Sequence, residues 1–249
     1  MASILLNLSS DSKMASETTD NFTVNFSPSV PISGNWTVAL QSASLWYSWY
    51  NISGDYGNQT FRYYNGVAWK DITITSGLYG LPDINTFVQA AMKANGDYTA
   101  GTPDVFDITL TPDYNTFKCL ITVSGGYQVD LTVGNLYKLL GFTAIIVTTS
   151  QEGENNVNIT NGIDKVLIHV DCVTGSYNGN TTSDVIYGFS PNVSPSSLIE
   201  IVPYQLINLP VNKSGYLNYV RIYITDQQNR RLNLNGETVS LGLILKRII

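Results

Sequence analysis

The sequence predicts an all-β fold: a single jelly-roll β-sandwich of two antiparallel sheets, with two short helices in its connecting loops. Val, Ile, Thr and Tyr recur in short runs of alternating polarity, and turn clusters separate these runs. Only two segments have a helical period, and both lie between predicted strands. Helices in such positions are typical of the corners of a two-sheet sandwich and less typical of an up-and-down barrel.

The N-terminal segment differs in composition from the rest of the chain. Residues 9–20 are rich in Ser and Thr and poor in apolar side chains. We expect residues 1–20 to be a flexible arm that becomes ordered only on assembly, and residues 21–249 to form the single jelly-roll domain. No basic stretch precedes the short apolar stretch at 4–6, so no signal peptide is expected.

Two strands are predicted in the first part of that domain. Residues 22–26 alternate in polarity and end at Ser27-Pro28. Residues 36–52 form the longest candidate, and their second half is apolar at both odd and even positions. A strand with one solvent-exposed face does not have this pattern, so we expect loops of the same chain or a neighbouring subunit to cover both sides.

The remaining strand candidates follow at short intervals. They are residues 60–64, 69–75, 105–111, 116–123, 127–133, 145–149, 165–174, 183–189, 198–209, 217–225 and 238–246. Turn residues at 112–115 and 124–126 predict a hairpin on each side of one strand. Residues 227–235 join the last two strands, and residues 153–161 and 176–183 are predicted to be polar surface loops.

Two helices are predicted from local signals. Pro82 and Asp83 are typical of a first helical turn, and Asn95-Gly96 is typical of a helix end. Between them, apolar residues follow the i, i+3, i+4, i+7 pattern at Ile84, Phe87, Val88 and Ala91. The second predicted helix covers residues 135–140 and ends at Gly141.

The composition excludes several classes of function. The chain of 249 residues is 43% hydrophobic and 13% charged, with a net charge of -6 and 13 basic residues. Without a basic block, direct binding of nucleic acid is not expected. No apolar run approaches the roughly 20 residues that a membrane-spanning helix needs. The two cysteines, Cys119 and Cys172, lie in separate predicted strands and are expected to be buried, reduced thiols.

No catalytic, cofactor-binding or metal-binding residues are predicted, and we do not expect an enzyme. The single histidine, His169, shares a strand face with Asp171, but no Gly-x-Ser-x-Gly motif supplies a nucleophile. His169 is therefore interpreted as a hydrogen-bonded sheet residue. Asp104, Asp107 and Asp113 lack the spacing of a calcium loop, and the chain has too few His and Cys residues for a zinc site.

Aromatic clusters at residues 46–50 and 61–64 are the remaining candidates for a functional surface. Three interpretations stay open: ordinary sandwich core, a subunit interface, or a platform that stacks on sugars. The candidate interface or ligand-stacking residues are Trp46, Tyr47, Trp49, Tyr50, Tyr63 and Tyr64.

Three blocks of sequence carry a family resemblance. They are GLPDINTF at 80–87, NLYKLLGF at 135–142, and YVRIYITD at 219–226, which continues through LNLNGE at 232–237 to the apolar residues 243–245. Residues 168–172 followed by 183–187 also fit. From about residue 20 onward, the chain resembles the penton (minor capsid) single jelly-roll proteins of Polinton/Maverick elements, adintoviruses and virophages.

The resemblance implies a structural protein of the virion. Homopentamers would plug the fivefold vertices of an icosahedral capsid, among trimeric double jelly-roll major capsid proteins, after assembly inside the host cell. Members of this family differ in having extra domains on their outward loops, and the short polar loops here predict no large appendage. The alternative is a carbohydrate- or receptor-binding β-sandwich module that uses the aromatic clusters.

Overall fold

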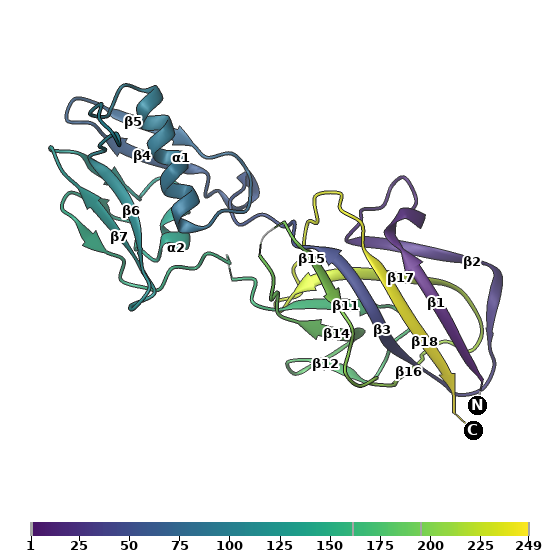
Figure 1. Cartoon of the computed structure of the whole chain (residues 1–249). Coiled ribbons are helices and arrows are strands. Elements are labelled where there is room, and N and C mark those ends of the chain that lie inside the picture. The colour runs from purple at the N-terminus through teal and green to yellow at the C-terminus, as the bar shows by residue number, and fades with distance from the viewer. Residues whose placement is uncertain (1, 161, 195, 249) are drawn as a thin grey trace. The chain divides into compact units, whose positions relative to one another are not determined.

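The computed structural model describes residues 2–160, 162–194 and 196–248. The chain divides into two compact units, one formed by Met1–Trp49 with Ile163–Ile249 and the other by Tyr50–Gly162 (Figure 1). We call them unit 1 and unit 2. Both are built mainly from antiparallel strands, which confirms the predicted all-β class. Within the described ranges, no helix is long and apolar enough to cross a membrane.

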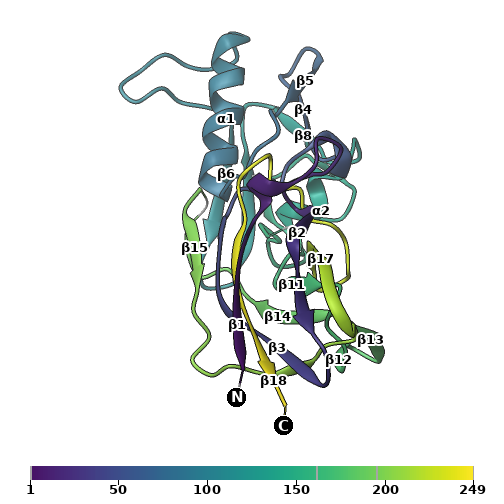
Figure 2. The same ribbon diagram turned by 90° about the vertical axis from the view of Figure 1, so that its right-hand side faces the viewer.

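Unit 1 is a sandwich of two antiparallel sheets. The first, which we call the β3 sheet, has the strand order β1 (Ser3–Ser9), β18 (Ser240–Arg247), β3 (Trp36–Trp46), β15 (Leu198–Ile201), and β16 (Leu209–Pro210) also pairs with β3. The second, the β17 sheet, has the order β14 (Val185–Phe189), β11 (Val166–Val170), β17 (Gly215–Asp226), β2 (Asn21–Ile32). Figure 2 shows β1 and β18 side by side.

The strand pairing of unit 1 is that of a jelly roll. The first strand of the unit pairs with the last, β1 with β18, and β2 pairs with β17. Inside these pairs, β3 pairs with β15 and β11 with β14. Such nesting arises when one long antiparallel ribbon folds over on itself, and it defines the jelly roll that the sequence predicted.

Alternating side chains fill the space between the two sheets. Leu45 of β3 and Leu243 of β18 are buried, as are Ile222 and Ile224 of β17. All five residues of β11 are buried, so this strand is covered on both faces. The period-2 pattern found in the sequence therefore corresponds to inward and outward sides of the sheets.

The N-terminal segment differs from the arm predicted over residues 1–20. Ser3–Ser9 form strand β1, whose seven residues each pair with a residue of β18, and Leu6 and Leu8 are buried. A short 3-10 turn, Ser10–Ser12, follows. The apolar residues at alternate positions explain the strand, because they give this segment one face that packs on the core. Ordering on assembly stays a prediction.

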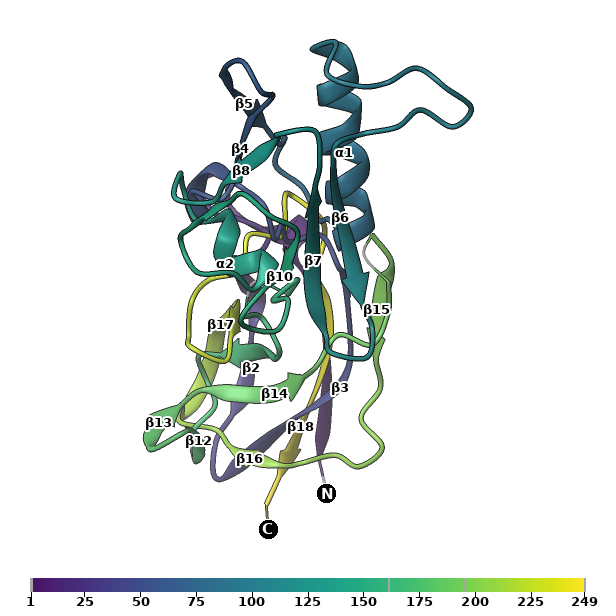
Figure 3. The ribbon, with the colours of Figure 1, turned by 90° about the vertical axis from the view of Figure 1, so that its left-hand side faces the viewer.

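Unit 2 lies in the sequence between β3 and β11. One of its sheets has the order β5 (Trp69–Thr73), β4 (Thr60–Tyr64), β8 (Gln128–Asp130), β9 (Ile146–Val147), and the other has the order β10 (Gln151–Glu152), β7 (Lys118–Val123), β6 (Ile108–Asp113). A 3-10 turn, Gly54–Tyr56, precedes β4. In Figure 3, helix α1 (Leu81–Ala94) runs beside β6. The second helix, α2 (Leu136–Leu140), precedes β9.

The existence of unit 2 corrects two expectations. Residues 21–249 do not form one continuous jelly roll, and the connection between β3 and β11 is a unit of its own with its own core. Strand β3 ends at Trp46, earlier than the predicted strand end at residue 52. The correction has a physical reason: strands of both units have the same residue pattern, and that pattern does not state which strands pair.

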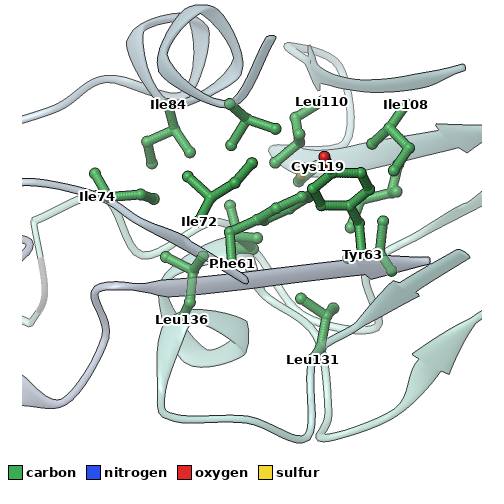
Figure 4. Packing of buried hydrophobic residues seen from close by; sticks show 14 of the residues in the cluster. Phe61, Tyr63, Ile72, Ile74, Ile84, Ile108, Leu110, Cys119, Leu131 and Leu136 are labelled. Carbon is green, nitrogen blue, oxygen red and sulfur yellow. The ribbon is translucent and has the colours of Figure 1, made fainter. Parts of the chain in front are cut away.

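The core of unit 2 is formed by strands from both sheets and one face of α1 (Figure 4). Phe61 and Ile72 pack with Ile84 of the helix and with Leu110 of β6. Both predicted helices are confirmed. Asp83 stabilises the start of α1, because its carboxylate accepts the backbone N–H of Gly80 at 2.8 Å.

Two predicted connections differ from the structure. The turn at 124–126 does not close a hairpin, because it joins β7 to β8 and these strands belong to different sheets. The polar loop predicted at 176–183 is a hairpin of β12 (Ser176–Asn178) and β13 (Thr181–Ser183). The hairpin of β6 and β7 is confirmed.

Candidate functional site

The six predicted aromatic residues fall into two groups in the structure. Tyr47, Trp49 and Tyr63 are buried, as in the core interpretation, and the rings of Tyr47 and Trp49 lie 4.3 Å apart between centroids. Tyr50 and Tyr64 are half-buried. Trp46 is 39% exposed, the largest exposure of the six. Their contact with a second copy or a ligand stays a prediction.

Tyr63 belongs to a hydrogen-bonded cluster in unit 2. Its hydroxyl donates to Asp97 at 2.6 Å, and Lys70 donates to the same carboxylate at 2.7 Å. Burial and this hydrogen bond raise the pKa of Tyr63 above its ordinary value. Burial alone would raise the pKa of Asp97, but the hydrogen bonds from Lys70 and Tyr63 outweigh it and lower the pKa. The cluster stabilises unit 2 internally.

The outward side of the β3 sheet has very few charged residues. Because Leu6, Ala43, Leu45 and Leu243 point into the core, the alternate residues point outward. We call this surface the charge-poor face. It consists of Leu5, Asn7, Ser9, Ser42, Ser44, Trp46, Leu198, Glu200, Ser240, Gly242, Ile244 and Lys246. Glu200 and Lys246 are the charged members of this set.

A depression of about 480 Å³ crosses the middle of the charge-poor face, and we call it the central trough. Small residues from three strands line it, among them Ser9, Ser44, Ser240 and Gly242. The pairing register places Ser9, Ser240 and Ser44 in one row across the sheet. A Cβ at position 242 would lie 2.7 Å from Oγ of Ser42, so a larger residue here would require the Ser42 side chain to move.

The outward side of the β17 sheet is polar, and His169 is at its centre. Nδ1 of His169 lies 2.7 Å from Oδ1 of Asp184, and Nε2 lies 2.8 Å from the hydroxyl of Thr225. The ring stacks on Tyr223 with 4.2 Å between centroids. The prediction of a hydrogen-bonded sheet histidine is confirmed, but its carboxylate partner is Asp184. Asp171, which the strand periodicity had suggested, instead pairs with Lys213 at 2.7 Å.

The electrostatics of this polar surface follow from those contacts. Burial alone would raise the pKa of Asp184, but hydrogen bonds from His169 and Tyr223 outweigh it and lower the pKa. Burial, together with the hydrogen bond to Asp184, raises the pKa of Tyr223 to about 12. The carboxylate therefore stays charged and the phenol stays neutral at physiological pH, which preserves the network.

The chemistry available around His169 is limited by these hydrogen bonds. A polar depression of about 620 Å³ opens here, but both ring nitrogens of His169 already have partners. Cys119 and Cys172 are buried, free thiols, as predicted, and burial raises the pKa of each to about 12. In the part of the chain that the structure describes, no three His, Cys, Asp or Glu side chains form a metal-binding group.

The sequence reasoning missed the charge-poor face. A signal was present, because Asn7 and Ser9, Ser42 and Ser44, and Ser240 and Gly242 occur at alternate positions of three strands. Each pair alone is typical of an ordinary solvent-exposed strand. The pairs become one surface only when β1, β18 and β3 align, which requires residues from both ends of the chain.

The fold thus defines a jelly-roll protein with a second unit inserted between two of its strands. The structure is similar to that of the mavirus penton protein, with a TM-score of 0.51 and 10% sequence identity, over 99% of this chain and 100% of that chain. No family model matches the chain, and no curated protein matches it in sequence. The resemblance found in the sequence is therefore supported at the level of the fold.

Proposed function

We propose that this chain is a structural minor capsid protein of the penton type. In this proposal it forms homopentamers that occupy the fivefold vertices of an icosahedral virion and acts without catalysis. Its partners there are further copies of itself and a trimeric double jelly-roll major capsid protein. Binding to nucleic acid has no part in the proposal, because the chain has 13 basic residues against 19 acidic ones.

The observation that carries the proposal is the likeness in fold to the mavirus penton protein over the full length of both chains. This likeness includes the inserted unit as well as the jelly roll, since 99% of this chain is covered. A charge-poor outward sheet face is consistent with it, because desolvation of charged groups in an interface is unfavourable. Such a face suits burial against protein.

Light scattering coupled to size-exclusion chromatography tests the proposal directly. We expect a species of about five times the chain mass of 27.3 kDa, and electron microscopy of the same fraction should show rings with fivefold symmetry. A monomer at every concentration up to the solubility limit would contradict it. The Glu237→Arg variant is a control for a change of surface charge. It should assemble like the wild type, since this exposed residue lies outside both sheet faces.

A second candidate function, glycan binding, is favoured by a surface of unit 2. Tyr64 and Trp69 face each other across β4 and β5 with 5.4 Å between ring centroids, and Trp69 is 38% exposed. The guanidinium of Arg62 lies 5.8 Å from the centroid of the Trp69 ring. Glycan-array binding by a monomer, lost in Trp69→Ala, would favour this function over the capsid role.

A further inference from the structure

We propose that the central trough of one copy receives Tyr216 and Tyr219 from strand β17 of a second copy, and that Glu200 of the first copy faces Arg221 of the second. The inference rests on the proposed pentamer and names the two surfaces that would form its contact. Four observations on unit 1 support it: the exposure of the tyrosines, the lining of the trough, two opposite charges without an ion pair among the described residues, and the placement of the two surfaces on different sheets.

The tyrosines project from the outward side of the β17 sheet. Leu217 and Val220 are buried in the sandwich, whereas Tyr216 is 66% exposed and Tyr219 is 46% exposed. The ammonium of Lys213 lies 4.0 Å from the centroid of the Tyr219 ring. Large aromatic side chains in such positions are typical of interfaces, because they combine apolar area with a hydroxyl that forms hydrogen bonds.

The central trough matches such side chains in size and chemistry. It holds about 480 Å³, and serine hydroxyls together with the amide of Asn7 line it. Hydroxyl and amide groups both donate and accept, so they satisfy a phenol hydroxyl in either role. Val202, which also lines the trough and is 79% exposed, supplies apolar contact for the aromatic rings.

The two surfaces carry opposite charges that form no ion pair with the described residues of the same copy. Glu200 is exposed at the end of the trough and forms no ion pair with any residue that the structure describes. Arg221 lies two residues after Tyr219 on the same side of β17, and its Nε donates to the amide oxygen of Asn21 at 2.9 Å. Pairing between copies would therefore give each charge a partner without disrupting an existing ion pair.

The placement of the surfaces makes the proposed contact heterologous. The trough lies on the outward side of the β3 sheet, and the tyrosines lie on the outward side of the β17 sheet, so the contact joins different surfaces of two identical copies. A contact of this heterologous kind leaves one unused surface at each end of a dimer. Repetition of it adds further copies and closes into a ring when the rotation between neighbours is about one fifth of a turn, as the proposed pentamer requires, whereas a contact of one face with itself stops at two copies.

Charge reversal tests the proposed contact in the full-length protein. Glu200→Arg and Arg221→Glu should each convert the pentamer to monomer at concentrations at which the wild type is pentameric. The double variant should recover the pentamer, because every contact then contains an exchanged pair. Glu237→Arg, a charge reversal at an exposed site outside both surfaces, should remain pentameric, and circular dichroism checks that each variant is folded.

A mixing experiment provides the second readout. Ser44→Arg blocks the trough and leaves the tyrosines, whereas the double variant Tyr216→Ser/Tyr219→Ser keeps the trough. Each should be monomeric alone, and an equal mixture should form 1:1 dimers that grow no further. If the wild type is pentameric and none of these variants changes its assembly, the assigned surfaces are wrong and the capsid proposal stands. If the wild type is monomeric, both are wrong.

Discussion

The two outward faces of the sandwich in unit 1 are built from the same kind of strand and differ in chemistry. The β17 sheet carries a network in which His169, Asp184 and Tyr223 satisfy one another. The charge-poor face of the β3 sheet carries serine, asparagine and glycine instead, and Glu200 there has no ion pair with a described residue. We infer that the polar network stabilises the fold. The charge-poor face contributes little to the free energy of unfolding and is available for contact with another protein.

The largest expected effect is at Asp184. The variant Asp184→Ala removes the carboxylate that accepts from His169 and from Tyr223, and His169 is only 2% exposed. A buried polar group left without its charged partner is strongly destabilising, so we expect the free energy of unfolding to fall by about 3 kcal/mol. Urea denaturation measures it. A loss within experimental error would show that this network does not distinguish the two faces.

Acidification should reveal the same network. Hydrogen bonds lower the pKa of Asp184 in the folded state below its value in the unfolded chain. This group therefore contributes stability that is present above the unfolded pKa, about 3.9, and is lost as the pH falls through the folded pKa. We expect the free energy of unfolding to fall more in the wild type than in Asp184→Asn as the pH is lowered from 6 to the lowest value at which both proteins are still folded. Midpoints of urea denaturation measure it. Parallel pH profiles would contradict this.

A smaller effect is expected in the central trough. In Gly242→Ala, the added methyl group approaches the hydroxyl of Ser42, and we expect a loss of about 1 kcal/mol. In a Ser42→Ala background the close contact is absent, so the same substitution should be nearly neutral. Thermal melts of the wild type and the three variants in this cycle measure the coupling. Equal losses of stability in both backgrounds would show that the loss does not arise from contact with the Ser42 hydroxyl.

The smallest effect is expected at Glu200, which makes it the matched control for Asp184. It is an exposed carboxylate on the opposite sheet and forms no ion pair with the residues that the structure describes. Glu200→Ala should change the free energy of unfolding by less than about 0.5 kcal/mol under conditions in which the protein is monomeric. A large loss in the monomer would remove the contrast between the two faces.

Some elements could be predicted because their signals are local. Helix α1 begins at Pro82 and Asp83 and buries the apolar positions Ile84 and Val88, all within one stretch of chain. The nested pairing that makes unit 1 a jelly roll was predicted only as a class. Pairs such as β1 with β18 join opposite ends of the chain, and no local pattern specifies them.

The site around His169 shows why strand periodicity alone does not identify a hydrogen-bond partner. Periodicity placed Asp171 on the same side of the strand, but the register between β11 and β14 shifts at Ile168/His169. Such an irregularity changes which residues lie opposite one another, and here Asp184, which immediately precedes β14, reaches the ring. The aromatic clusters show a related limit of local patterns, since the composition of a cluster does not state which rings are buried, and the structure buries Tyr47 and Tyr63.

The amino-acid sequence by itself determined the all-β character, both helices, the unpaired cysteines and the low content of charge, because these depend on residue type and on neighbours within a few positions. Only the tertiary structure decided that Tyr50–Gly162 form a separate unit, that β1 completes the β3 sheet, and that serines from three strands line one trough. Those features depend on contacts between residues far apart in the chain, and the free energy of such contacts is not expressed in any local pattern.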